Sequence, residues 1–236
     1  MKLLLNIKDF LIFPDSSRIQ FKSNKGLLEI FFKAFLCNFI IGFLILSTVS
    51  ALIRYRYNIN YKPNDHSIYY FLFINLLIIP IIEEIAFSLP LRFKIINLSL
   101  AIGIIFYFAS SYFFGTNIID YEYMFFYRLI IMFTSIIGSY LLFRYKRIQK
   151  VFDEFWKKNF KLIMYLFLFL AVFRHLDMYN LDFKTLILLP LLLAPQFVSC
   201  LITFYIRIKI GFGYAVLFHM LINMVAFMPQ IVKIIC

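Results

Sequence analysis

The 236-residue sequence has few of the residues that interrupt helices or form cross-links. It contains seven glycines, seven prolines and three cysteines, and only 15% of its residues are charged. A soluble domain has about 25% charged and about 45–50% apolar residues, whereas here 63% are hydrophobic. This composition excludes a soluble globule, a disordered chain and a disulfide-linked scaffold.

Acidic residues are also scarce, with 12 against 24 lysines and arginines, for a net charge of +12. The basic residues lie in short loops between apolar runs, which is typical of the positive-inside bias of membrane proteins and does not favour nucleic-acid binding. The three cysteines lie in or beside apolar runs without metal-ligand spacing, so we interpret them as small core residues. They are Cys37, Cys200 and Cys236.

Seven apolar runs have about the length that a helix needs to cross a bilayer, which is about 20 residues. They predict an all-α fold: a polytopic membrane protein of about seven transmembrane helices. We expect residues 1–28 to be an N-terminal cytoplasmic or interfacial segment and 29–236 a single transmembrane domain. The runs are Ala34–Ile53, Ile68–Leu91, Ile95–Ile119, Leu129–Phe143, Leu162–Leu176, Thr185–Ile206 and Ile210–Val232.

The distribution of lysine and arginine predicts the orientation. Alternate loops, at residues 1–28, 92–94, 144–161 and 207–209, hold 16 of these residues, and the other loops hold six. The more basic loops of a membrane protein face the cytoplasm. We therefore expect a cytoplasmic N-terminus in a bacterial inner membrane, with apolar residues before Pro14 forming an amphipathic segment on the membrane surface.

Ionisable residues inside apolar runs are the main anomaly of the sequence. Each costs about 2.5–3.5 kcal/mol at the bilayer centre. With a rise of about 1.5 Å per residue, the groups on three separate runs reach similar depth, so one polar cavity within the membrane satisfies them at the lowest free energy. The residues are Glu83, Glu84, Arg174, His175, His219 and the amide Asn223.

The spacing of these residues indicates a chemistry. Glu83 and Glu84 are adjacent and diverge by about 100° on a helix, so one can face the cavity while the other pairs elsewhere. His219 and Asn223 are four residues apart and share one face. A carboxylate beside an imidazole can move a proton from water, and an imidazole with an amide can donate to an oxyanion.

Three segments of the chain resemble the CPBP family, which comprises type II CAAX prenyl endopeptidases and bacteriocin-processing or self-immunity proteins. The similar segments read IIPIIEEIAFSLPLRF, AVFRHLDMYN and GFGYAVLFHMLINM, in the order of the family. The resemblance covers about residues 68–230 and implies intramembrane proteolysis. The substrate would be a membrane-associated peptide or protein, whether prenylated or anchored in another way, with membrane lipids as the surroundings.

The resemblance also implies roles for individual residues. Glu83 would work with His175 to activate water, and His219 with Asn223 would stabilise the tetrahedral oxyanion. In the family, an arginine four residues after the second glutamate, here Glu84, holds that carboxylate.

The sequence departs from the family pattern at two positions. Ser88 stands where the arginine is expected, and Ala171 stands where the middle motif usually has phenylalanine. A buried carboxylate without a cation either becomes neutral or finds another partner. We expect Arg174 to supply the missing cation to Glu84, with Arg92 as a second candidate.

Two other functions remain open from the sequence. Glu83, His175 and His219 can ligate zinc, although we favour water activation without a metal or other cofactor, because no His-Glu-x-x-His helix is present. Alternatively, Ser88 marks a catalytically weak or inactive relative, which acts as an immunity or scaffold protein by binding a peptide in the same cavity.

Overall fold

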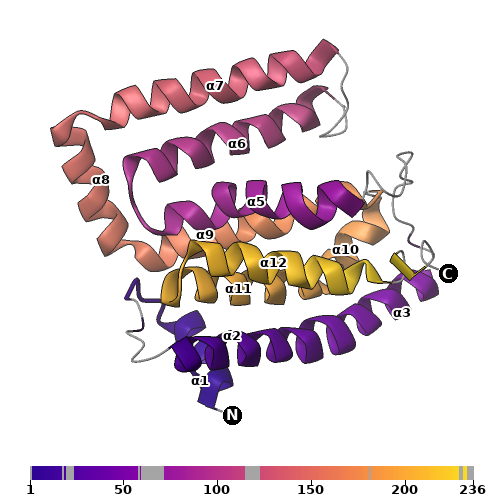
Figure 1. The fold of residues 1–236 in the computed structure, drawn as a ribbon. Coiled ribbons are helices and arrows are strands. Elements are labelled where there is room, and N and C mark those ends of the chain that lie inside the picture. The colour runs from indigo at the N-terminus through magenta and orange to yellow at the C-terminus, as the bar shows by residue number, and fades with distance from the viewer. Residues whose placement is uncertain are drawn as a thin grey trace.

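The computed structural model is helical almost throughout, which confirms the predicted all-α class. Most of the helices run roughly side by side, with one short helix across their ends (Figure 1). The structure describes residues 2–17, 19, 24–57, 59, 72–114, 123–180, 182–228 and 231–232.

The helical elements follow one another with short connections. Several are short π-helical or 3-10 stretches (labelled η) that continue a neighbouring α-helix. The elements are α1 (Lys2–Ile12), α2 (Asn24–Asn38), η1 (Phe39–Ser47), α3 (Thr48–Tyr57), η2 (Ile74–Ile78), α5 (Ile79–Glu83), η3 (Glu84–Ser88), η4 (Leu89–Leu91), α6 (Ile95–Phe114), α7 (Tyr123–Phe143), α8 (Lys146–Lys158), α9 (Phe160–Phe173), η5 (Arg174–Met178), α10 (Phe183–Leu192), α11 (Ala194–Lys209) and α12 (Phe212–Ala226).

The seven predicted apolar runs are helical over most of their described length, and their residues 68–71, 115–119 and 229–230 lie outside the described part. In that described part, three helices have the length and composition to cross a membrane, or five if each of two bent pairs counts as one. Two further apolar helices are shorter. The three are Lys25–Tyr57, Ile74–Leu91 and Met124–Phe143, the pairs are Lys146–Lys158 with Phe160–Leu176 and Phe183–Leu192 with Ala194–Lys209, and the shorter two are Ile95–Ser111 and Phe212–Ala226.

Helix α11 lies at the centre of the hydrophobic core. All its residues from Leu201 to Ile208 are buried, and it contacts η1, α2, α9 and α12. A helix that is buried on every side is held by packing rather than by one amphipathic face. This central position lets α11 carry side chains to both the glutamate segment and the N-terminal region.

The N-terminal helix α1 packs against α11. Phe10 is buried, with its ring 5.5 Å from that of Tyr205 in an edge-on contact. Beyond α1, Lys209 donates a hydrogen bond to the Asp15 carboxylate. Partial burial, the largest single influence, raises the pKa of Asp15, but the hydrogen bonds from Lys209 and Ser17 and the positive charge of Lys209 together outweigh it and hold the pKa below its usual range. In the predicted surface segment, Ile7, Phe10 and Leu11 therefore pack in or against the protein core, whereas Phe13 is exposed.

Helices α6 and α7 lie side by side along one edge of the bundle (Figure 1). Their close approach depends on Gly103, which is buried in α6. A Cβ atom at this position would lie 2.8 Å from the Met132 carbonyl oxygen and 2.3 Å from Cγ1 of Ile136. Neither the α7 backbone nor a branched Ile side chain can yield easily at such distances.

We expect Gly103→Ala to destabilise the protein, because the added methyl group forces α6 and α7 apart. Overpacking of this kind costs about 1–3 kcal/mol. The control is Gly138→Ala on α7, where a Cβ would meet nothing within 4 Å, so that this variant should be as stable as the wild type or more so. Thermal unfolding in detergent measures both, and equal melting temperatures would contradict the packing argument.

Candidate functional site

A cavity of about 360 Å³ lies among the elements that carry the predicted polar residues. Its walls come from α2, η1, η2, α5, η3, α9, η5, α11 and α12. Six of the seven predicted site residues line it, and Arg92 does not. The six are Glu83, Glu84, Arg174, His175, His219 and Asn223.

The two glutamates are positioned by a change of helix type. Pro80 is the second residue of the short helix α5, which ends at Glu83, and the π-helical stretch η3 begins at Glu84. Short π-helical stretches within α-helices are frequent at functional sites. Both carboxylates are buried, with residue exposures of 6% for Glu83 and 4% for Glu84, so each requires a partner within the protein.

His219 on α12 contacts both carboxylates. Its Nδ1 atom is 2.8 Å from Oε1 of Glu84, and its Nε2 atom is 3.5 Å from Oε2 of Glu83. An ionised carboxylate can only accept, so the shorter contact favours a proton on Nδ1. Both glutamates line the cavity, and the two ring nitrogens reach one carboxylate each.

Arg174 lies against Glu83. Its Nε atom is 3.8 Å from Oε1 of Glu83, and its guanidinium lies 5.0 Å from the centre of the Phe108 ring. We expected this cation to serve Glu84, but the contact of that carboxylate is with His219. Arg92, the second candidate, donates to the Ile208 carbonyl oxygen at 2.6 Å. The cation beside the glutamates thus comes from η5.

His175 and Asn223 are arranged differently from their expected roles. His175 lines the cavity, but its ring has no hydrogen-bond partner among the described residues. Asn223 donates its amide to the Asn75 carbonyl oxygen at 2.9 Å. The imidazole that reaches Glu83 is that of His219, and the Asn223 amide is bound to the backbone of η2.

Ser88 and Arg207 form the end of the glutamate segment. Ser88, which stands where an arginine was expected, donates its hydroxyl to the Glu84 carbonyl oxygen at 3.0 Å. Arg207 on α11 is 4% exposed and donates to the carbonyl oxygens of Ser88 and Leu89, both at 3.2 Å. Sequence reasoning counted Arg207 as a loop charge, since no local pattern distinguishes it from its basic neighbour Lys209.

The described residues hold no group of three or more His, Cys, Asp or Glu side chains arranged to bind a metal ion. Of the alternative zinc ligands, Glu83 and His219 approach each other, and His175 does not complete a set with them. The cluster of Glu83, Glu84 and His219 is instead joined by hydrogen bonding and ion pairing among its own members.

The fold and the cavity define an all-helical protein with several helices able to span a membrane and a buried cluster of ionisable side chains. Comparison with known proteins gives no match, because no family model, no curated protein and no solved structure is significantly similar to the chain.

We expect Arg207→Met to destabilise the protein, because it removes the buried guanidinium that donates to the Ser88 carbonyl oxygen, whereas the Leu89 carbonyl oxygen keeps Asn97 as a donor at 3.4 Å. Each unsatisfied buried acceptor costs about 1–3 kcal/mol. Arg207→Lys keeps the charge and can reach one carbonyl, so its loss should be smaller. Thermal unfolding in detergent measures both variants, and a methionine variant as stable as the wild type would refute the role of Arg207.

Proposed function

We propose that the protein is an intramembrane endopeptidase that hydrolyses a peptide bond in a membrane-associated substrate. The observation that carries this proposal is the contact of His219 with both buried glutamates on the wall of a cavity. A buried imidazole between two carboxylates is a proton-transfer group, and the free energy lost by burying three ionisable side chains favours a functional reason for their presence.

In the proposed reaction, Glu83 accepts a proton from a water molecule as the water oxygen attacks the peptide carbonyl carbon. His219 acts in its doubly protonated form: its Nδ1 donates to Glu84, which orients the ring, and its Nε2 donates to the oxyanion that develops on the former carbonyl oxygen. The carbon–nitrogen bond then breaks, and the leaving amine takes the proton from Glu83. Arg174 places a positive charge beside Glu83, and His175 on the cavity wall is available to hold the attacking water.

The proposed setting is a bilayer that is crossed by about seven helices around the cavity, with the N-terminus in the cytoplasm of a bacterial cell. This number requires the three helices of sufficient length, each of the two bent pairs as one span, and the two shorter apolar helices. The basic segments at residues 92–94, 144–161 and 207–209 lie at one end of the bundle (Figure 1). The positive-inside rule requires such an arrangement of cytoplasmic loops.

The similarity to the CPBP family supports the same proposal from the order of the motifs along the chain. Here His219 takes the place of the missing arginine as the partner of Glu84. A charged imidazole or a neutral one with a proton on Nδ1 can stabilise that carboxylate. The departure at Ser88 therefore leaves Glu84 with a partner from another helix.

A second candidate is a peptide-binding immunity or scaffold protein without catalysis. Two observations favour it over a fully assembled enzyme. The Asn223 amide, which would donate to the oxyanion, is bound to the Asn75 carbonyl, and the ring of His175 has no hydrogen bond to either glutamate among the described residues. Catalysis requires both side chains to turn towards a bound substrate.

We expect Glu83→Gln to abolish proteolysis, because the amide cannot accept the proton of the attacking water. Loss of a general base lowers the rate by about 10²–10⁴-fold. Membrane proteomics of cells with the wild type, Glu83→Gln or the matched control Glu29→Gln, an exposed residue paired with Lys33, measures the effect. An uncleaved precursor should accumulate with Glu83→Gln alone, and identical membrane proteomes would favour the binding protein.

We expect the activity to survive metal removal, because the proposed reaction uses only protein side chains. The purified protein is treated with a strong zinc chelator and assayed on the precursor found above, and its zinc content is measured by elemental analysis. Loss of activity with the chelator and its recovery with added zinc would instead support the zinc alternative with Glu83 and His219 as ligands.

A further inference from the structure

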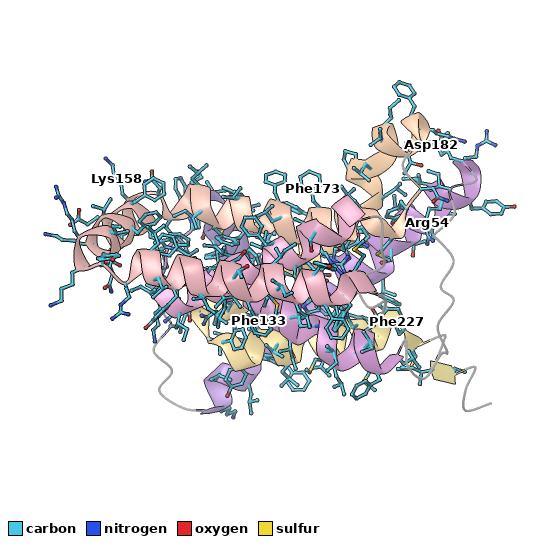
Figure 2. The ribbon with its side chains drawn as sticks, turned by 90° about the horizontal axis from the view of Figure 1, so that it is seen from above. Arg54, Phe133, Lys158, Phe173, Asp182 and Phe227 are labelled. Carbon is cyan, nitrogen blue, oxygen red and sulfur yellow. The ribbon has the colours of Figure 1, made fainter. Side chains whose placement is uncertain are left out.

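Helix α8 crosses the end of the bundle between α7 and α9 (Figure 1). It makes an angle of 87° with the helix Phe160–Leu176 that follows it. If that apolar helix crosses the bilayer, α8 lies nearly parallel to the membrane surface. Figure 2 shows Lys158 at the outer end of this region, with side-chain nitrogen atoms pointing away from the bundle.

One face of α8 is anchored to the protein by aromatic contacts. The Trp156 ring, which is 8% exposed, lies 5.4 Å from that of Phe93 and 6.2 Å from that of Phe167. Phe152 lies 4.8 Å from Phe143. These contacts hold the helix at a set rotation about its own axis, so its other side chains face outward in a defined direction.

The outward stripe of α8 combines apolar and basic side chains. Val151 and Phe155 are 59% and 50% exposed. Arg147 lies one helical turn before Val151, and Lys158 lies one turn after Phe155, so the four residues follow one another along the helix surface. Exposed apolar residues flanked by basic ones are typical of helices that lie in the headgroup region of a membrane.

The charge of this region is strongly one-sided. Residues 144–161 contain seven basic and two acidic side chains. The acidic ones are already paired, Asp153 with Lys157 at 2.6 Å and Glu154 with Lys150 at 3.9 Å. The other five basic side chains are exposed and make no ion pair with a carboxylate in the described part of the chain. They are Arg144, Lys146, Arg147, Lys158 and Lys161.

We propose that the outer face of α8 is a binding surface for anionic phospholipids of the leaflet beside it. The lipid phosphates are bound by the exposed basic side chains, and the acyl chains contact Val151 and Phe155. An anionic leaflet fits because it complements the charge and also supplies the apolar contact that a soluble acidic partner would lack. This proposal does not depend on whether the cavity is catalytic.

Trp156 is the only tryptophan in the chain, so its emission reports on lipid next to α8. The full-length protein is reconstituted in vesicles of phosphatidylcholine and phosphatidylglycerol, with brominated chains, which quench tryptophan, on one lipid or the other. We expect brominated phosphatidylglycerol to quench more strongly, with a preference of about fivefold at low salt, the effect of roughly one basic residue near a charged surface. High salt should reduce this preference.

Two variants test the surface itself. In the triple variant Lys146→Gln, Arg147→Gln and Lys158→Gln, both brominated lipids should quench the Trp156 emission equally. The double variant Asp153→Asn with Glu154→Gln should show a stronger preference for phosphatidylglycerol than the wild type. Circular dichroism and an unchanged emission maximum verify that each variant is folded. Equal quenching by both lipids in the wild type, a preference that persists in the triple variant, or a preference that is insensitive to salt would overturn the proposal.

Discussion

Two adjacent carboxylates buried in an apolar helix are the constraint on which the rest of this structure depends. A lone ionised carboxylate is strongly unfavourable there, so Glu83 and Glu84 must be matched by donors or cations from elsewhere. His219 on α12 and Arg174 on η5 supply them. The packing of α12 and of the end of α9 around the glutamate segment therefore supplies partners for the buried carboxylates in addition to burying apolar surface.

Because position 88 is a serine, no cation stands one turn after Glu84 on its own helix. An arginine one turn away on the same helix would neutralise Glu84 locally, whereas here the neutralising groups arrive from distant parts of the sequence. Arg207 stabilises the end of the glutamate segment through its backbone. Since the site is assembled from several elements, a change in the packing of α11 or α12 will alter its geometry, which couples the stability of the fold to the proposed chemistry.

Much of the architecture could be predicted, because long apolar runs indicate membrane-spanning helices and the few ionisable residues within them indicate a shared polar site. The runs became helices, and the polar residues Glu83, Glu84, His175, His219 and Asn223 line a common cavity. The pairings within the cavity could not be predicted. Glu84 binds His219 rather than Arg174, and Asn223 binds a backbone carbonyl, because partners are chosen by helix rotation and by π-helical stretches that leave no mark in a hydropathy pattern.

The sequence by itself determined that the chain is helical, that it is suited to a membrane, and that a few ionisable residues must meet within it, because isolated charges in hydrocarbon are too unfavourable to remain apart. Only the tertiary structure decided which nitrogen faces which carboxylate, that Arg207 is a buried donor rather than a loop charge, and that α8 lies at a steep angle to the helix that follows it. These outcomes depend on long-range packing around α11, where contacts between residues far apart in the chain set distances that local periodicity does not encode.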